Sequence, residues 1–165
     1  MNIALAEKVA VVTGGGGGIG SQICRIFAAA GARVVITHRG GEGEIRAEKA
    51  LHSLVGSGHM LVRAAVDSAV DQIYLAEQVE KRYGKVDILV NNAGMTRFVA
   101  PDDLDGLDDE TIDTIFRVNW RGAFATIRTL EPLLRTSGDG LIVNISSIAG
   151  TTGIGSNIAY CASKS

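Results

Sequence analysis

Short apolar runs alternate along the chain with longer segments in which apolar residues recur every three or four positions. Apolar, β-branched runs of four to seven residues are typical of buried strands, and the longer segments are typical of helices that cover a sheet. The alternation predicts repeated strand–helix–strand units around a parallel sheet. The expected strands are residues 9–12, 33–37, 60–66, 86–90 and 141–145.

Helical periodicity and helix-terminating residues place the segments between these strands. Gly31 and Gly84 follow two of the periodic segments, and glycine commonly ends helices. The acidic stretch 102–110 suits a solvated loop and a helix start, and Pro132 is expected to kink or shorten the helix that follows. The expected helices are residues 19–30, 42–55, 69–83 and about 110–135, and another begins near Asn157.

Composition narrows the kinds of partner. The chain is 46% hydrophobic and 21% charged, as in an ordinary globular domain, and its net charge of -2 offers no basic face to nucleic acid or an anionic membrane. No apolar run approaches the ~18 residues of a membrane span. Cys24 and Cys161 lie far apart without Cys/His spacing, which argues against a metal site or a disulfide framework. We therefore expect a cytoplasmic protein with a small-molecule partner, no metal, no nucleic acid and no membrane.

Five consecutive glycines stand in the segment Thr13–Gly20, between the first strand and the first helix. At this place the free N–H groups and positive dipole end of a helix can bind a pyrophosphate. A glycine run alone could equally be a flexible linker. The flanking strand and amphipathic helix, together with the turn Asn91–Gly94 after the fourth strand, favour a nucleotide site.

The C-terminal part carries candidate catalytic residues. Tyr160 and Lys164 are four residues apart, so a helix places them on one face, and a nearby cation favours the phenolate form of a tyrosine. Such a pair can exchange a proton with a carbonyl or alcohol oxygen, although a surface tyrosine and lysine would show the same spacing. Ser147 precedes Tyr160 by thirteen residues. Asn119 lies in mid-helix, where asparagine is unfavourable, and is either a satisfied buried residue or a functional one.

Together these motifs resemble the short-chain dehydrogenases/reductases. The pattern consists of Thr-Gly-x-x-x-Gly-x-Gly over 13–20, Asn-Asn-Ala-Gly over 91–94, and Asn119, Ser147 and Tyr-x-x-x-Lys in family order. The resemblance covers the whole chain and implies an α/β fold with a Rossmann-type, doubly wound parallel sheet. Residues 1–165 would be an NAD(P)-binding domain, incomplete at the C-terminus.

Family members continue beyond the lysine with two more strands. The resemblance therefore implies a domain truncated after its fifth strand and the start of the next helix. Because that helix would hold Tyr160 and Lys164, we expect residues 1–165 alone to be inactive. The parent protein is expected to be a homo-oligomer.

The resemblance also implies the cofactor contacts. Ala65 stands where many members have an acid or asparagine against the adenine, which leaves a backbone contact from Val66. The pyrophosphate would be lined by Gly14, Gly18, Ile19 and Gly20, and the adenosine side by Asn91, Ala93 and Gly94.

The end of the second strand decides between NADP and NAD, because an Asp there binds a ribose 2′-hydroxyl and a basic residue accepts a 2′-phosphate. His38 stands where NAD-preferring members carry the acid, and Arg39 can attract a phosphate. NADP is therefore favoured. Gly17 stands where many NADP-binding members place a second basic residue, so NAD remains the alternative.

In the reaction that the resemblance implies, Ser147 binds the substrate oxygen and Tyr160 is the general acid or base. Lys164 favours the phenolate and binds the nicotinamide ribose, and Asn119 holds a water that feeds protons to Lys164. The result is an NAD(P)-dependent carbonyl/alcohol oxidoreductase, such as a 3-oxoacyl reductase-like enzyme. Sugars, steroids and small ketones stay open as substrates, and a non-enzymatic dinucleotide sensor is the alternative function. A nucleotide-fold methyltransferase is disfavoured, because it would need an acid in place of His38 and Arg39.

Overall fold

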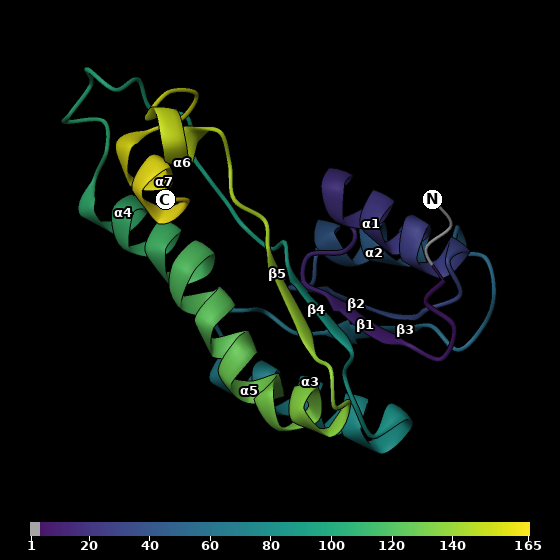
Figure 1. Cartoon of the computed structure of the whole chain (residues 1–165). Coiled ribbons are helices and arrows are strands. Elements are labelled where there is room, and N and C mark those ends of the chain that lie inside the picture. Colours follow the sequence, from purple (N-terminus) through teal and green to yellow (C-terminus); the bar gives the residue numbers. More distant parts are fainter. Residues whose placement is uncertain (1–3) are drawn as a thin grey trace.

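The computed structural model describes residues 4–165, and its centre is a five-stranded parallel sheet (Figure 1). The order across the sheet is β3-β2-β1-β4-β5, so the winding direction reverses between β1 and β4. This order confirms the predicted doubly wound, Rossmann-type fold. The strands are β1 (Val9–Val12), β2 (Arg33–His38), β3 (Met60–Arg63), β4 (Ile88–Asn91) and β5 (Leu141–Asn144).

Helices cover both faces of the sheet (Figure 1). Val9 and Val11 of β1 pack with residues of α3 (Ala69–Tyr83) and α5 (Gly122–Thr136). Ala10 and Val12 point to the opposite face and pack with residues of the other two helices. Because successive strand residues alternate between faces, a strand buried on both must be apolar throughout, as β1 is. The helices on this second face are α1 (Gly18–Ala29) and α2 (Glu42–His52).

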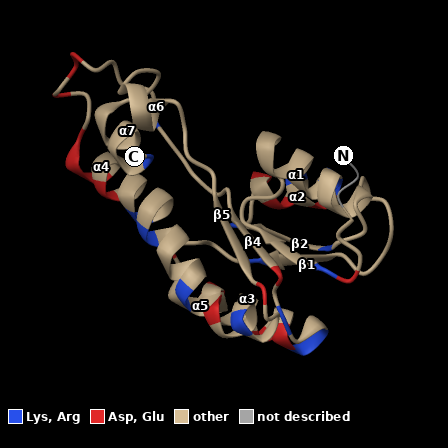
Figure 2. Ribbon diagram, viewed as in Figure 1, with Lys and Arg blue, Asp and Glu red and all other residues tan. Residues whose placement is uncertain are grey.

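Three further helices gather beyond the end of the sheet: α4 (Asp109–Phe116), α6 (Ala149–Thr152) and α7 (Ile158–Ser163). Helix α7 packs against both α4 and α6. Acidic residues are concentrated on the loop before α4 (Figure 2). Asp108 begins α4 as its N-cap, since its side chain accepts a 2.7 Å hydrogen bond from the Thr111 N–H.

The helix predicted over residues 110–135 is not one continuous α-helix. A five-residue π-helical turn, η1 (Arg117–Arg121), separates α4 from α5, and the Gly122 N–H bonds to the Arg117 carbonyl. Pro132 does not shorten α5, which continues to Thr136. Although proline removes one helical hydrogen bond, Leu133 and Leu134 are buried and hold the last turn in the core.

Strand β3 and helix α2 both end three residues earlier than predicted. Strand β3 ends at Arg63, because its neighbour β2 ends at the paired His38, and residues 64–66 leave the sheet. Helix α2 ends at His52 instead of residue 55. Within residues 4–165, no helix has the length and apolar character needed to cross a membrane.

Candidate active site

A cavity of about 870 Å³ lies at the carboxyl ends of the strands, beside the point where the strand order reverses. In open α/β sheets this crevice is where ligands bind. Its walls come from the glycine loop, the ends of β2 and β3, the segment after β4, and residues of α2, α4 and η1. The volume lies within the range of small-molecule and cofactor sites.

The glycine loop packs too closely on its neighbours for side chains at several positions. A Cβ at Gly16 would lie 2.6 Å from the Ala47 nitrogen of α2, and one at Gly20 would lie 2.6 Å from the Asn92 Nδ2. Gly14 has a φ of +62°, in the left-handed region that favours glycine. These three residues therefore bring the first turn of α1 close to α2 and the end of β4.

Gly18 faces open space, since a Cβ there would meet no atom within 4 Å. Gly17, the N-cap of α1, offers no side chain to the first-turn N–H groups, which have no acceptor within the helix. No acidic residue lies in this turn. The helix start thus presents free donors and a positive dipole end to the cavity, an arrangement that fits a pyrophosphate.

The paired asparagines after β4 have separate places. Asn92 lines the cavity, and its Nδ2 donates to the carbonyls of Thr13 at 2.9 Å and Gly14 at 3.1 Å. Asn91 is buried and donates to the Asn144 Oδ1 at 2.8 Å, which joins β4 to β5. Of the cofactor contacts expected in this turn, Ala93 and Gly94 line the cavity, whereas Asn91 lies outside its lining. Asn92, which does line the cavity, was not among the expected contacts.

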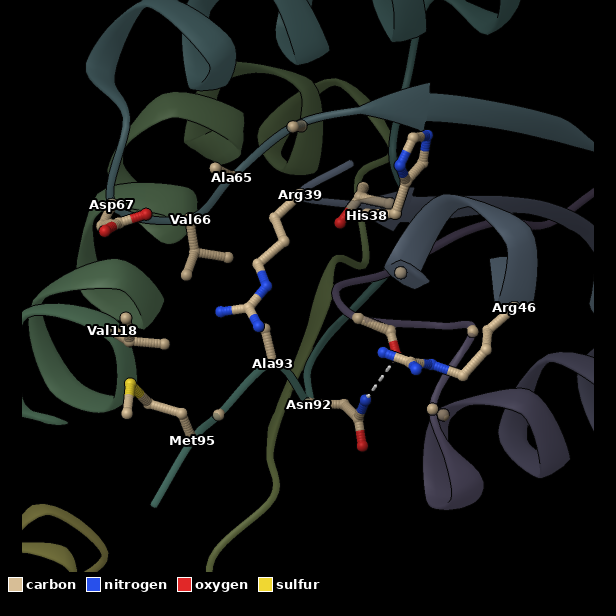
Figure 3. A pocket seen from close by; sticks show the side chains of 18 of the residues that line it. His38, Arg39, Arg46, Ala65, Val66, Asp67, Asn92, Ala93, Met95 and Val118 are labelled. Carbon is tan, nitrogen blue, oxygen red and sulfur yellow. Dashed lines mark hydrogen bonds between the residues drawn. The ribbon is translucent and has the colours of Figure 1, made fainter. Parts of the chain in front are cut away.

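At the other end of the cavity lie His38 and Arg39 (Figure 3), of which the first is buried and the second exposed. The His38 ring is buried, and its Nδ1 accepts a 3.1 Å hydrogen bond from the Gly40 N–H. Arg39 is exposed and extends into the cavity, near Val66. The guanidinium of Arg39 is therefore the group that can meet an anionic ligand here.

Two further arginines, which no sequence pattern indicated, line this cavity. Arg46 reaches it from α2 and forms an ion pair of 3.2 Å with Glu42. Arg117 reaches it from η1 and lies 3.5 Å from the Asp67 carboxylate. With Arg39, the cavity holds more basic than acidic side chains, which suits a phosphorylated ligand.

A second cavity of about 380 Å³ brings together three of the predicted catalytic residues, Ser147, Tyr160 and Lys164. The two cavities adjoin, because both are lined by Ile19, Asn92, Gly94 and Met95. A ligand in the first cavity can therefore extend to the catalytic candidates.

Lys164 follows α7 and is half-buried. Its Nζ donates to the Ile145 carbonyl at 2.8 Å, and burial lowers the pKa of its ammonium group. A Cβ at Gly94 would lie 3.4 Å from the Lys164 Nζ and 3.3 Å from the Asn119 Oδ1. The missing side chain at Gly94 thus leaves room for both polar groups.

Asn119 lies in η1, and π-helical turns are frequent at functional sites. Its Oδ1 accepts from the Met95 N–H at 2.8 Å, and its Nδ2 donates to the Met95 carbonyl at 3.0 Å and the Ser163 Oγ at 2.9 Å. The side chain is therefore buried and satisfied, and it also joins the segment after β4 to the end of α7.

The two serines after β5 have different partners. The Ser147 Oγ accepts a 3.2 Å hydrogen bond from the Ala149 N–H, which leaves its own hydrogen free to donate. The Ser146 Oγ donates to the Lys164 carbonyl at 2.6 Å and so supports the end of α7. The two bonded residues are 18 positions apart in the sequence.

Comparison with known proteins gives consistent matches. The family model described as short chain dehydrogenase matches residues 8–165. The chain is 35% identical over 162 residues to the D-threitol dehydrogenase of Mycolicibacterium smegmatis, covering 97% of this chain and 60% of the relative. It is 36% identical over 166 residues to the 3-oxoacyl-acyl-carrier-protein reductase FabG of Thermotoga maritima, covering 97% and 63%.

Solved structures show the same likeness. The Pseudomonas aeruginosa RhlG/NADP active-site complex superposes with a TM-score of 0.87 at 32% identity, covering 99% of this chain and 64% of that chain. Levodione reductase superposes with a TM-score of 0.86 at 26% identity, covering 97% and 62%. The chain thus spans about three fifths of the length of these two dehydrogenase and reductase relatives.

Proposed function

Because this chain belongs to the short-chain dehydrogenase family, we propose that it supplies the dinucleotide site and the catalytic residues of an oxidoreductase that interconverts a carbonyl and an alcohol. The observation that carries the proposal is the meeting of Ser147, Tyr160 and Lys164 in a cavity that adjoins the glycine-loop cavity. A sensor that only binds a dinucleotide would not need these three side chains together.

When bound, a nicotinamide dinucleotide supplies or accepts the hydride. Val66, Ala93 and Gly94 would line its adenosine side, and Arg39 would bind a 2′-phosphate, so we propose NADP in preference to NAD. The NADP complex of the RhlG relative is consistent with this choice. The pyrophosphate would be held by Gly14, Gly18, Ile19 and Gly20.

The proton chemistry belongs to the chain's own residues. In the reductive direction the Tyr160 hydroxyl donates a proton to the substrate oxygen, and in the oxidative direction the phenolate accepts it. The free hydrogen of Ser147 donates to the same oxygen and orients it. Lys164 would bind the nicotinamide ribose, and Asn119 holds Met95 and Ser163 in place beside Lys164.

A 3-oxoacyl thioester is the substrate class that we propose, on the similarity to the Thermotoga reductase. Met95 and Thr96 would meet the substrate, because both line the second cavity beside Tyr160. The similarity to a D-threitol dehydrogenase makes sugar alcohols the second class to be assayed.

We also propose that the protein is a homo-oligomer. Trp120 and Phe124 stack with ring centroids 6.2 Å apart, and they are 62% and 54% exposed. Exposed aromatic groups of this size are typical of protein interfaces. The surface formed by Phe116, Trp120 and Phe124, called the aromatic face below, would meet a second copy.

The test of the catalytic proposal is Tyr160→Phe in the full-length protein. General acid catalysis contributes roughly 10²–10⁴-fold, so NADPH-dependent reduction of a 3-oxoacyl thioester should fall at least a hundredfold, with cofactor affinity retained. Tyr74→Phe is the matched control, because Tyr74 is an exposed tyrosine of α3. A Tyr160→Phe enzyme that turned over near the wild-type rate would show that another group is the acid.

A further inference from the structure

Tyr160 lies in the first turn of helix α7, which begins at Ile158. The N–H groups of a first turn have no acceptor within the helix, so the group that binds them fixes how the helix begins. The exact place of Tyr160 therefore depends on the contacts at the start of α7.

Asn157 makes the contacts at the first end. Its Oδ1 accepts a 2.8 Å hydrogen bond from the Tyr160 N–H, which makes it the N-cap of α7. Its Nδ2 donates to the Arg97 carbonyl at 2.6 Å and the Thr96 Oγ1 at 3.2 Å. The residue is 1% exposed, so one buried amide joins α7 to the segment after β4.

The same segment is bound to α7 again after Tyr160. Ser163 accepts a hydrogen bond from Asn119, and Asn119 makes two hydrogen bonds with the Met95 backbone. Residues 95–97 are thus attached to α7 on both sides of Tyr160 in the sequence. Because Met95 and Thr96 also line the second cavity, this segment and Tyr160 face the same ligand.

Resting on the proposed function, we propose that Asn157 is a positioning residue for the reaction. Its amide sets the place of Tyr160 relative to the Met95–Arg97 segment, and hence to the bound substrate. Its role goes beyond capping, because a cap needs only the Oδ1 acceptor. The two Nδ2 hydrogen bonds, called the Asn157 bridge, connect the start of the helix to the substrate side.

Asn157→Ser separates the two roles. Serine is about as good an N-cap as asparagine, so the hydrogen bond to the Tyr160 N–H can be kept. Its shorter side chain has no amide to donate to the Arg97 carbonyl, so the bridge is lost. Ser68→Asn is the matched control, because it exchanges the same two cap residues at the start of α3.

Two measurements on the full-length protein test the proposal. Losing a buried hydrogen bond so that its acceptor is left unpaired changes the equilibrium for local opening of the helix roughly tenfold. Amide hydrogen exchange over residues 158–163 should therefore be about tenfold faster in Asn157→Ser. A displacement of about 1 Å can cost a hundredfold in rate, so kcat should fall at least tenfold while the Kd for NADPH stays within about twofold.

Unchanged hydrogen exchange in Asn157→Ser, or faster exchange with an unchanged kcat, would overturn the positioning role. If the wild-type protein showed no turnover but the exchange result held, the catalytic proposal would fail while the bridge stood.

Discussion

Arg39 is a single side chain on which the choice of cofactor depends. It is exposed and extends into the larger cavity, whereas the neighbouring His38 ring is buried and bonded to the Gly40 N–H. Within the lining of that cavity the acidic residue is Asp67, and Arg117 lies within 3.5 Å of it. No acidic residue of the lining therefore lies beside the Arg39 guanidinium at the end of β2. An acidic side chain at that place would repel a 2′-phosphate.

We expect Arg39→Ala to weaken binding of NADPH selectively. A charge-assisted hydrogen bond contributes about 1.5–3 kcal/mol, so the Kd for NADPH should rise roughly 10- to 100-fold, with the Kd for NADH changing less than about threefold. Fluorescence titration of both cofactors measures this. Arg25→Ala, on the exposed side of α1, is the control for loss of a surface arginine. Equal losses for the two cofactors would contradict a 2′-phosphate contact.

Individual site residues could be predicted where they belong to a short sequence motif. Ser147, Tyr160 and Lys164 were found from their spacing, and the structure brings all three to one cavity. Arg46 could not be found in this way, because it reaches the cavity only through the close packing of α2 on Gly16. Asn157 was also missed as a functional candidate, because the two partners of its Nδ2, Thr96 and Arg97, lie 60 or more residues away in the sequence.

At the level of elements, a buried carboxylate joins the starts of β1 and β4. Asp87 is 1% exposed, accepts a hydrogen bond from the Val9 N–H at 2.9 Å, and lies 3.0 Å from the ammonium groups of Lys8 and Lys85. Burial acts to raise the pKa of Asp87, but these hydrogen bonds and charges outweigh it, and the pKa lies below its usual range. The ionised form therefore stabilises the fold.

This arrangement predicts a pH-dependent effect of Asp87→Asn. Because the pKa is lower in the folded than in the unfolded protein, the stabilisation is complete above about pH 4 and is lost as the pH falls through the folded-state value. At pH 7 the substitution should lower the free energy of unfolding by about 1–2 kcal/mol, and the difference should shrink at pH 3. Denaturant unfolding at both pH values measures this, with Asp105→Asn on the exposed loop as control. A difference that did not depend on pH would contradict the assignment.

Elements were predictable where burial on both sides imposed a continuous apolar run. Strand β1 covers the predicted residues 9–12, and β4 and β5 were placed to within two residues at each end. The predicted bounds were wrong where a neighbouring strand sets the length. Strand β3 ends at Arg63 because this residue pairs with His38, the last residue of β2. The π-helical turn η1 could not be predicted, because it contains Asn119, whose partners Met95 and Ser163 come from other parts of the chain.

At the scale of the whole molecule, the aromatic face is the exposed surface that argues for self-association. Phe116, Trp120 and Phe124 recur every four residues along the helices, and Arg128 continues the row, 5.9 Å from the Phe124 ring centroid. In a symmetric dimer this row would meet its own copy, so each contact between the two rows would occur twice.

Trp120→Glu should therefore lower the oligomeric state of the full-length protein. A charge at the centre of an apolar interface loses its hydration without gaining a partner, which costs several kcal/mol and shifts the dissociation constant at least a hundredfold. Light scattering coupled to size exclusion at micromolar concentration measures the mass. Val55→Glu places the same charge at an exposed apolar residue after α2 and should leave the mass unchanged. A Trp120→Glu protein with the wild-type mass would rule out the aromatic face as the interface.

The wide turn η1 has a consequence for how the sequence can change over evolutionary time. Its hydrogen bond from Gly122 to Arg117 spans five residues instead of four, so the helix holds one more residue than an α-helix of the same turn count. Deleting one residue after Asn119, such as Trp120, could restore regular α-helical geometry at little cost in helix content. The residues on either side would keep their faces of the helix, because the wide turn already absorbs the extra residue. The packing of α5 on the sheet would thus be kept, whereas the turn that carries Asn119 would change shape and its hydrogen bonds to Met95 and Ser163 would be lost. Such a deletion should therefore be selected against because of Asn119, even though the helix itself would tolerate it.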